Sequence, residues 1–336
     1  NKRCLFFLSL LIFFAGHSTY SQHNIYGKWS GEITAGNKFW RFETAIYLEN
    51  EITKVITDFP DIGRYGIISS IQKKDSNQFR LEVNEGNNNS IFTGNFSGDT
   101  FSGDWSGLNL KATFSAKRIS NNYSVEYVVE EVRFTNGNVT LAGSLYLPTT
   151  KRKRYPSVVF THGSGNQTRN EGSYRSRAVL LARSGIATLI YDRRGKGESS
   201  GSGNDATWET LADDASAANR YLKTRNDIDK KKIGIAGFSQ GGWVCPLAVI
   251  RNKGFSFIVV GSASATTPQE QNDYNVEQFL KNRALQGEII LAIMNLRKEV
   301  FHYQHYGKGD KQKLQNQINE LSPNEWFPIT QLPVKL

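Results

Sequence analysis

The feature that most constrains the fold is a change in hydrophobic pattern near residue 120. From Ile25 to about Ser120, short alternating runs of apolar and polar residues are separated by Gly, Asn, Asp and Ser. Such runs predict a small all-β domain, built as an antiparallel barrel or sandwich. From Val125 onward, apolar runs of strand length alternate with helical segments. This second pattern predicts a mainly parallel sheet with helices on both faces.

The first region carries two similar phrases, Gly27–Gly31 and Gly103–Gly107, each with the pattern Gly-x-Trp-Ser-Gly. We expect them to form turns at the first and last strands and to meet where a barrel closes. The region shows no catalytic constellation, so we expect a structural role. Binding of an apolar ligand and shaping of the neighbouring domain's entrance are the alternatives. The other predicted strands are Phe39–Leu48, Ile52–Thr57, Gly66–Gln72, Gln78–Val83, Ser90–Phe96 and Leu108–Phe114.

The N-terminus has the order of a secretory signal peptide. Lys2 and Arg3 precede an apolar run, and small or polar residues follow up to Ser21. We predict a signal peptide at residues 1–21, removed before Gln22, and hence a secreted or periplasmic bacterial protein without stable membrane insertion. A short uncleaved anchor is the alternative. Cleavage leaves a single cysteine, Cys245, which we expect to be buried in a helix and not to act as a nucleophile.

Composition excludes several classes of protein. A hydrophobic share of 38% with 12% aromatic residues excludes a wholly disordered chain. No apolar stretch reaches the length of a membrane-spanning helix. The basic runs Lys151–Arg154 and Lys230–Lys232 precede strand-like segments, which is typical of solvated loop ends. Because no exposed aromatics interleave with them, we expect no nucleic-acid partner. The oligomeric state is not indicated.

The phrase Gly237-Phe-Ser239-Gln-Gly241 is the most informative about chemistry, because it joins an apolar strand to a helix. A sharp strand-to-helix turn would project the Ser239 hydroxyl from the sheet edge, as a nucleophile requires. Such a turn needs residues without bulky side chains on both sides of the serine, and Gly237 and Gly241 meet this need. The N-terminus of the following helix would favour developing negative charge. The alternative is an ordinary glycine-rich turn.

A second phrase, Thr161–Gly165, follows the predicted strand Val158–Thr161. Acyl transfer passes through a tetrahedral oxyanion, which needs two N–H donors aimed at it. We expect one donor to be the backbone N–H of Gln240. The other is expected in this loop, with Ser164 favoured and Gly163 next. His162 is expected to shape the loop and not to act as general base. An ordinary glycine-rich turn is again the alternative.

Three phrases together resemble the α/β-hydrolase superfamily: His162–Gly165, Tyr191–Ser199 and Gly237–Gly242. With its preceding β-domain, the whole chain is similar to bacterial secreted two-domain serine esterases. The resemblance implies that Asp192 and Arg193 are scaffold residues. It also implies a β-domain at 22–120 and a hydrolase domain at 121–336. Within the latter, helices at about 267–330 resemble a lid, with ordinary packing helices as the alternative.

The superfamily's chain order is serine, acid, then histidine. Pro333–Leu336 is typical of the start of the next strand, so we expect the acid and the histidine beyond Leu336, and the hydrolase domain to be incomplete. His302 and His305 lie three residues apart on a predicted helix and lack a third metal ligand nearby. The predicted function is hydrolysis of small carboxylic esters without metal or organic cofactor. An aminopeptidase-like peptidase and a non-catalytic binding protein are the alternatives. Residues 22–336 alone are expected to show no meaningful esterase activity.

Overall fold

The computed structural model describes residues 24–336 except 76, 86–87, 166 and 204–205. The chain divides into two compact units. One comprises Asn1–Ala236 and Val244–Val259, and the other comprises Gly237–Trp243 and Val260–Leu336. The predicted signal peptide lies outside the described residues.

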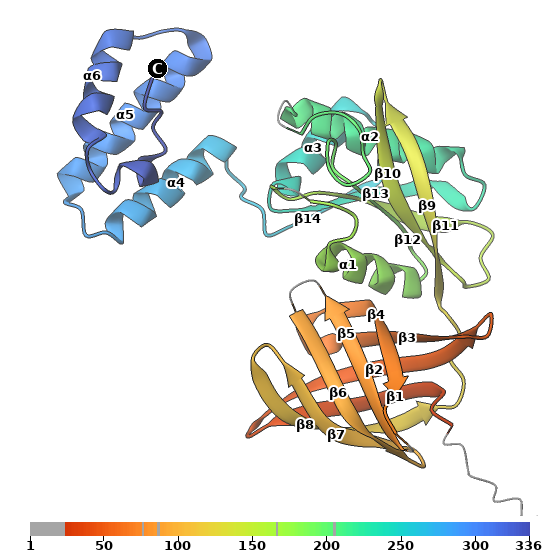
Figure 1. The fold of residues 1–336 in the computed structure, drawn as a ribbon. Coiled ribbons are helices and arrows are strands. Elements are labelled where there is room, and N and C mark those ends of the chain that lie inside the picture. Colours follow the sequence, from red (N-terminus) through yellow and green to blue (C-terminus); the bar gives the residue numbers. More distant parts are fainter. Residues whose placement is uncertain (1–23, 76, 86–87, 166, 204–205) are drawn as a thin grey trace, which may run out of the picture. The chain divides into compact units, whose positions relative to one another are not determined.

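The first region forms a closed barrel of eight antiparallel strands in chain order (Figure 1). The barrel closes through β1 and β8, where Trp29 lies opposite Arg118 and Ile33 opposite Phe114. Of the two architectures expected from the alternating pattern, the barrel is therefore confirmed. The strands are β1 Gly27–Ala35, β2 Lys38–Glu49, β3 Ile52–Phe59, β4 Arg64–Lys73, β5 Gln78–Glu85, β6 Asn88–Ser97, β7 Thr100–Gly107 and β8 Leu110–Ser120, with a short 3-10 helix, η1, at Pro60–Ile62.

Aromatic side chains fill the barrel. Because successive side chains point to opposite faces of a strand, alternate residues enter the interior. Phe92 and Phe101 are fully buried there. Phe96 stacks on Phe101 with ring centroids 4.1 Å apart, and Phe42 packs on Phe92 at 4.7 Å. The interior is thus an apolar core built from short alternating strands.

The prediction for the two Gly-x-Trp phrases was wrong in two respects. Both phrases lie within strands and not at turns, and the second lies in β7, so that β8 separates it from β1. A side chain at Gly31 would place its Cβ 2.3 Å from the Ser115 carbonyl oxygen, and one at Gly103 would lie 2.2 Å from that of Thr93. These glycines therefore permit close approach of neighbouring strands.

The second region forms a six-stranded sheet in the order β14-β13-β11-β12-β10-β9. β11 and β12 run parallel, whereas β10 is antiparallel to both β9 and β12. Helix α1 lies on one face, and α2 and α3 lie on the other (Figure 1). The α/β-hydrolase architecture is confirmed. The elements are β9 Tyr127–Asn136, β10 Val139–Pro148, β11 Tyr155–Thr161, α1 Gly172–Arg183, β12 Ala187–Tyr191, α2 Trp208–Thr224, β13 Ile228–Phe238, α3 Gly241–Arg251 and β14 Phe257–Gly261.

Helix α1 also contacts the barrel, through β3 and β4. The Tyr65 backbone N–H donates to Ser176 Oγ at 3.1 Å, and Arg183 Nη1 pairs with Asp58 Oδ2 at 2.5 Å. Gly66 has φ 68°, and a Cβ there would lie 2.6 Å from Val179. Strand β4 can therefore approach α1 this closely only with glycine at position 66.

Beyond β14 the chain forms three helices and a short 3-10 helix, with their own apolar core that includes Leu296, Ile318 and Phe327. Buried Arg297 donates to Asp273 Oδ1 at 2.8 Å from Nη2. The helices occupy the segment predicted as a lid, but covering a pocket remains a prediction. They are α4 Pro268–Lys281, α5 Gly287–Tyr306, α6 Lys311–Leu321 and η2 Phe327–Thr330.

The strand expected at Pro333–Leu336 is absent. Instead, Gln315 of α6 holds this segment: its Nε2 donates to the Val334 carbonyl at 2.9 Å, and its Oε1 accepts from the Leu336 N–H at 2.8 Å. The Gln315 side chain thus binds the backbone groups that strand pairing would use.

Among the helices of the described residues, none combines the length and apolar character that crossing a bilayer requires.

Candidate active site

Ser239 lies at the turn between β13 and α3, and it is exposed. Its φ of 54° is in the left-handed region, which a non-glycine residue adopts at a cost. The Ser239 N–H donates to the Gly261 carbonyl at 3.2 Å, and its own carbonyl accepts from the Gly242 N–H at 2.8 Å. The structure thus holds a serine hydroxyl in a strained backbone turn at the start of a helix.

Gly242, one residue into α3, is tightly packed at this turn. A Cβ on Gly242 would lie 2.0 Å from the Cβ of Ala263. The Trp243 indole Nε1 also donates to the Thr266 carbonyl at 2.9 Å, so the start of α3 is fixed against the segment after β14. That Gly237 and Gly241 leave space for this turn stays a prediction.

His162 follows β11 and is buried. Its Nε2 faces the Tyr191 carbonyl oxygen, so the neutral ring carries its proton on Nε2 and donates to that carbonyl. Burial lowers the pKa of His162 to about 4. The ring also packs edge-on against Tyr191, with centroids 4.6 Å apart. A neutral, buried imidazole that fixes β11 to the end of β12 positions the loop that follows it.

The two candidate oxyanion donors of this loop differ in the structure. The Gly163 N–H already donates to Tyr174 Oη at 2.8 Å, and burial raises the pKa of Tyr174, which keeps that phenol neutral. Ser164 is exposed, and its carbonyl accepts from Gln167 Nε2 at 3.1 Å. Because the Gly163 amide is occupied, Ser164 is the stronger candidate.

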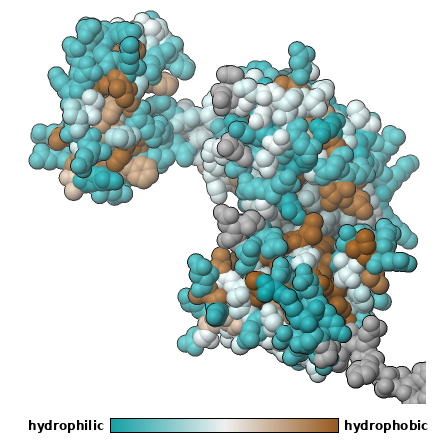
Figure 2. Space-filling model, in the orientation of Figure 1, coloured by the Kyte–Doolittle hydropathy of each residue, from teal (hydrophilic) through white to brown (hydrophobic). Residues whose placement is uncertain are grey.

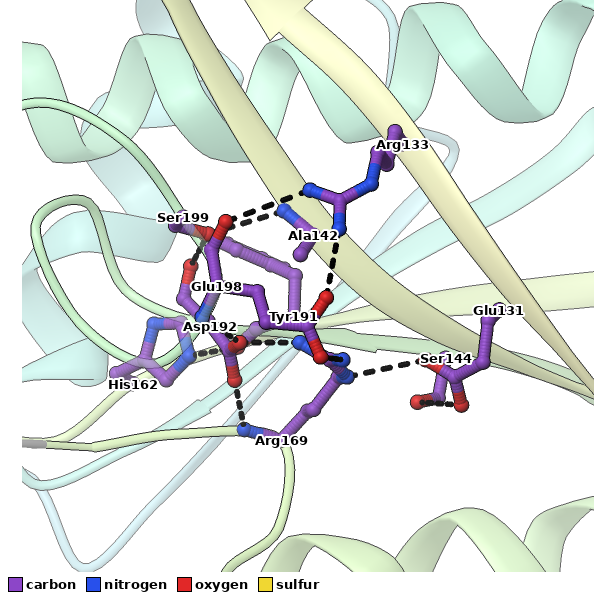
Figure 3. A network of polar contacts seen from close by, with 10 residues as sticks. All are labelled: Glu131, Arg133, Ala142, Ser144, His162, Arg169, Tyr191, Asp192, Glu198 and Ser199. Atoms are coloured by element: carbon purple, nitrogen blue, oxygen red, sulfur yellow. Dashed lines mark hydrogen bonds and ion pairs between the residues drawn. The ribbon is translucent and has the colours of Figure 1, made fainter.

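Asp192 is buried at the centre of a polar network (Figure 3). Its carboxylate accepts from the backbone N–H groups of Arg169 and Glu198, each at 2.8 Å, and pairs with the Arg169 guanidinium. Arg169 Nη2 also donates to Glu198 Oε1 at 2.6 Å, and this guanidinium lowers the pKa of Glu198. Ser199 Oγ donates to the Asp192 carbonyl at 2.7 Å. The loop after β12 is thus held in its conformation by hydrogen bonds to Asp192.

Two arginines tie this loop to its surroundings. Arg193 Nη1 donates to the Gly163 carbonyl at 3.3 Å, which links the loop to the candidate oxyanion segment. Arg194 Nε donates to Asp214 Oδ2 of α2 at 2.7 Å, and Asp214 is itself buried. The contacts of Asp192, and the contact of Arg193 with Gly163, thus hold backbone segments in place.

Within the described part of the chain, no histidine or carboxylate is hydrogen-bonded to the Ser239 hydroxyl. His302 and His305 lie exposed on α5, where they pack on aromatic rings. The described residues also contain no cluster of three potential metal ligands. Cys245 is buried and packs on Thr161 Oγ1 at 3.3 Å. Burial raises the pKa of its thiol to about 11, which disfavours the reactive thiolate.

Residues 153–319 match the family model described as serine aminopeptidase, S33. This match covers a strand–turn–helix with a serine at positive φ, in a six-stranded sheet with helices on both faces. This part of the chain belongs to the α/β-hydrolase superfamily. The assignment establishes hydrolase architecture without deciding which bond is cleaved.

The chain is similar to two curated proteins and to one solved structure. The chain is 30% identical over 142 residues to the uncharacterised protein YcjY of Escherichia coli, covering 40% of this chain and 45% of that protein. It is 26% identical over 190 residues to the uncharacterised protein PA2218 of Pseudomonas aeruginosa, covering 55% and 50%. The structure of Est1E from Butyrivibrio proteoclasticus with ferulic acid bound is 24% identical, with a TM-score of 0.38 and coverage of 41% and 55%. The chain thus spans about half the length of the curated relatives it matches.

Sequence reasoning missed three residues that hold the site loops: Arg169, Tyr174 and Glu198. Arg169 and Tyr174 lie in and after an irregular segment that has no motif. Glu198 falls inside the phrase that marked Asp192, yet its partners come from Arg133 and Arg169 elsewhere in the chain. Only the spatial arrangement shows these contacts, because no local spacing encodes them.

Proposed function

We propose that the whole protein is a serine hydrolase that cleaves small carboxylic esters through an acyl-enzyme on Ser239. The observation that carries this proposal is the exposed Ser239 at φ 54° between β13 and α3. A strained turn at this position costs stability and is typical of a site where a nucleophile must be presented. The superfamily assignment supports the same chemistry.

In the proposed reaction, the Ser239 oxygen attacks the ester carbonyl carbon while a general base accepts the hydroxyl proton. The backbone N–H groups of Gln240 and Ser164 hold the resulting oxyanion. The carbon–oxygen bond to the alcohol then breaks, and the alcohol leaves with that proton. Water attacks the acyl-enzyme and releases the acid. In support, the strands that precede the two donor segments, β11 and β13, are neighbours in the sheet.

The base and the acid that orients it are proposed to come from outside the described residues. Two observations support this: the Ser239 hydroxyl has neither partner among the described residues, and the chain spans about half the length of its relatives. An unassisted serine hydroxyl is a poor nucleophile. We further propose that α4–α6 cover the acyl pocket, and that residues 1–21 direct secretion.

The second candidate is a peptidase on the same fold, which the description of the matching family favours. Parallel assays of the whole protein on p-nitrophenyl butyrate and on aminoacyl p-nitroanilides separate the two. We expect turnover of the ester and its loss in Ser239→Ala, with residues 22–336 alone inactive on both. Faster anilide turnover identifies the peptidase. Robust Ser239-dependent turnover by residues 22–336 contradicts the proposed origin of the base.

A further inference from the structure

A cavity of about 360 Å³ opens at one end of the barrel, beside the β1–β2, β3–β4 and β7–β8 connections. Its floor is apolar and buried. An eight-stranded barrel is just wide enough to hold either its own side chains or one small ligand. The buried residues that line the cavity are Ile33, Phe59, Ile67, Val83 and Trp105.

Trp105 has a hydrogen-bonding capacity that the described residues leave unused. The residue is only 6% exposed, and its indole Nε1 has no hydrogen-bond partner among the described residues. The other buried tryptophan of this core, Trp29, donates its Nε1 to the Ile25 carbonyl at 2.9 Å. Trp105 lines the cavity. Because buried donors are almost always paired, its unpaired indole N–H is a group that an acceptor on a bound ligand would satisfy.

The rim of the cavity is apolar where the barrel meets solvent. Ile62, Leu108 and Leu110 line the cavity and are 59%, 64% and 47% exposed. Figure 2 shows apolar patches within the mostly hydrophilic surface of the barrel. Apolar residues gathered around a hollow are typical of a ligand site, whereas isolated ones are not. The entrance therefore favours an apolar molecule.

The charged groups at the rim compensate one another. Arg41 Nε donates to Asp61 Oδ1 at 2.8 Å, and Arg64 Nη1 lies 3.5 Å from Glu85 Oε1. A carboxylate or ammonium ligand would have to break one of these pairs to find a partner. We propose that this cavity binds a small uncharged molecule with an apolar body and a carbonyl that accepts the Trp105 indole N–H.

The test uses 6-propionyl-2-(dimethylamino)naphthalene, a neutral naphthyl ketone whose emission moves to the blue in apolar surroundings. We expect saturable binding of one molecule per chain with blue-shifted emission. 2-Naphthoate, which has a similar body but a negative charge, is expected to compete at least tenfold more weakly than 2-acetylnaphthalene, a neutral ketone that the proposed hydrolase reaction cannot cleave. Absence of saturable binding overturns the proposal, and equal competition by the two compounds overturns the choice of an uncharged ligand.

Three variants test whether the ketone binds in the barrel cavity. Trp105→Phe keeps the aromatic ring and removes the donor, so the dissociation constant should rise roughly three- to tenfold. Leu110→Ser at the rim should weaken binding without touching the core. Phe39→Ser is the matched control, because Phe39 is exposed at the same end but does not line the cavity. Wild-type binding by both Trp105→Phe and Leu110→Ser, or an effect of Phe39→Ser as large as theirs, contradicts the assignment.

Ser239→Ala keeps this result separate from the proposed hydrolase reaction. The barrel cavity involves no residue of the strained turn, so ketone binding should be the same in Ser239→Ala and wild type. Loss of binding in Ser239→Ala would place the ketone in the hydrolase site and overturn the barrel proposal.

Discussion

The barrel interior and the loops that follow β11 and β12 keep their shapes by different means. The barrel is filled by aromatic side chains such as Phe92 and Phe101, which pack by shape alone. The loops are held by a buried charge, Asp192, and by backbone donors that converge on it. The barrel should therefore tolerate apolar replacements of similar volume, whereas the loops should require particular polar atoms.

The largest effect is expected from breaking the loop network. Asp192→Ala leaves the 8%-exposed Arg169 guanidinium without its most buried partner, which should lower the free energy of unfolding by about 3–5 kcal/mol. Urea denaturation measures this change. The double variant Asp192→Asn, Arg169→Met is the control, and it should cost less than the sum of the two single variants. If the loss of unfolding free energy in the double variant equals the sum of the losses in the two single variants, the two residues do not interact as a pair.

Phe92 tests the barrel side of the comparison. Phe92→Ala should lower the free energy of unfolding by about 3–5 kcal/mol, because it opens a cavity among buried aromatic rings. Phe92→Leu keeps most of the volume and should cost clearly less. Denaturant melts of the two variants measure the difference. Similar costs for both would show that the barrel also depends on specific ring contacts.

His162 gives the loops a pH dependence that the barrel core lacks. Its pKa is about 4 in the folded chain, below the ordinary value of 6.5. The unfolded state therefore binds the proton first, so stability is full above pH 6.5 and falls as the pH drops towards 4, by about 3 kcal/mol. Unfolding at pH 7, 5.5 and 4 measures this loss. His162→Asn keeps a donor for the Tyr191 carbonyl and should show a smaller acid loss; an identical loss would exclude His162 as its source.

The smallest expected effect concerns the strained turn. Ser239→Gly removes the Cβ from a residue at φ 54°, and it should be up to about 1 kcal/mol more stable than Ser239→Ala, which keeps the strain. Thermal melts of the two variants make the comparison. If Ser239→Gly is the less stable of the two, the turn is not strained.

The sequence predicted what depends on local pattern. Period-two alternation indicated the barrel strands, and a serine flanked by glycines between strand and helix indicated the turn where Ser239 has positive φ. The prediction put the Trp105 phrase at a turn of the last strand, whereas Trp105 lies inside β7 with its indole in the core. Alternation fixes the face of a side chain and not the strand order, so it could not correct this placement.

The loop contacts were beyond sequence reasoning for a different reason. Tyr174, which lies in the next helix, accepts a hydrogen bond from the Gly163 N–H. Arg169 donates to Glu131 of β9 and to Glu198 of the loop after β12. Each contact joins segments that are distant along the chain and carry no shared spacing. That the Gly163 amide is already occupied is therefore visible only in the structure.

The most direct test of the account is covalent labelling of the whole protein with an alkyl fluorophosphonate, followed by peptide mass spectrometry. This reagent phosphonylates a serine only where the hydroxyl is activated as a nucleophile. We predict one label per chain, located on Ser239, and no label in Ser239→Ala. A whole protein that stays unlabelled at Ser239, or that is labelled equally in Ser239→Ala, would contradict the assignment of Ser239 as the nucleophile.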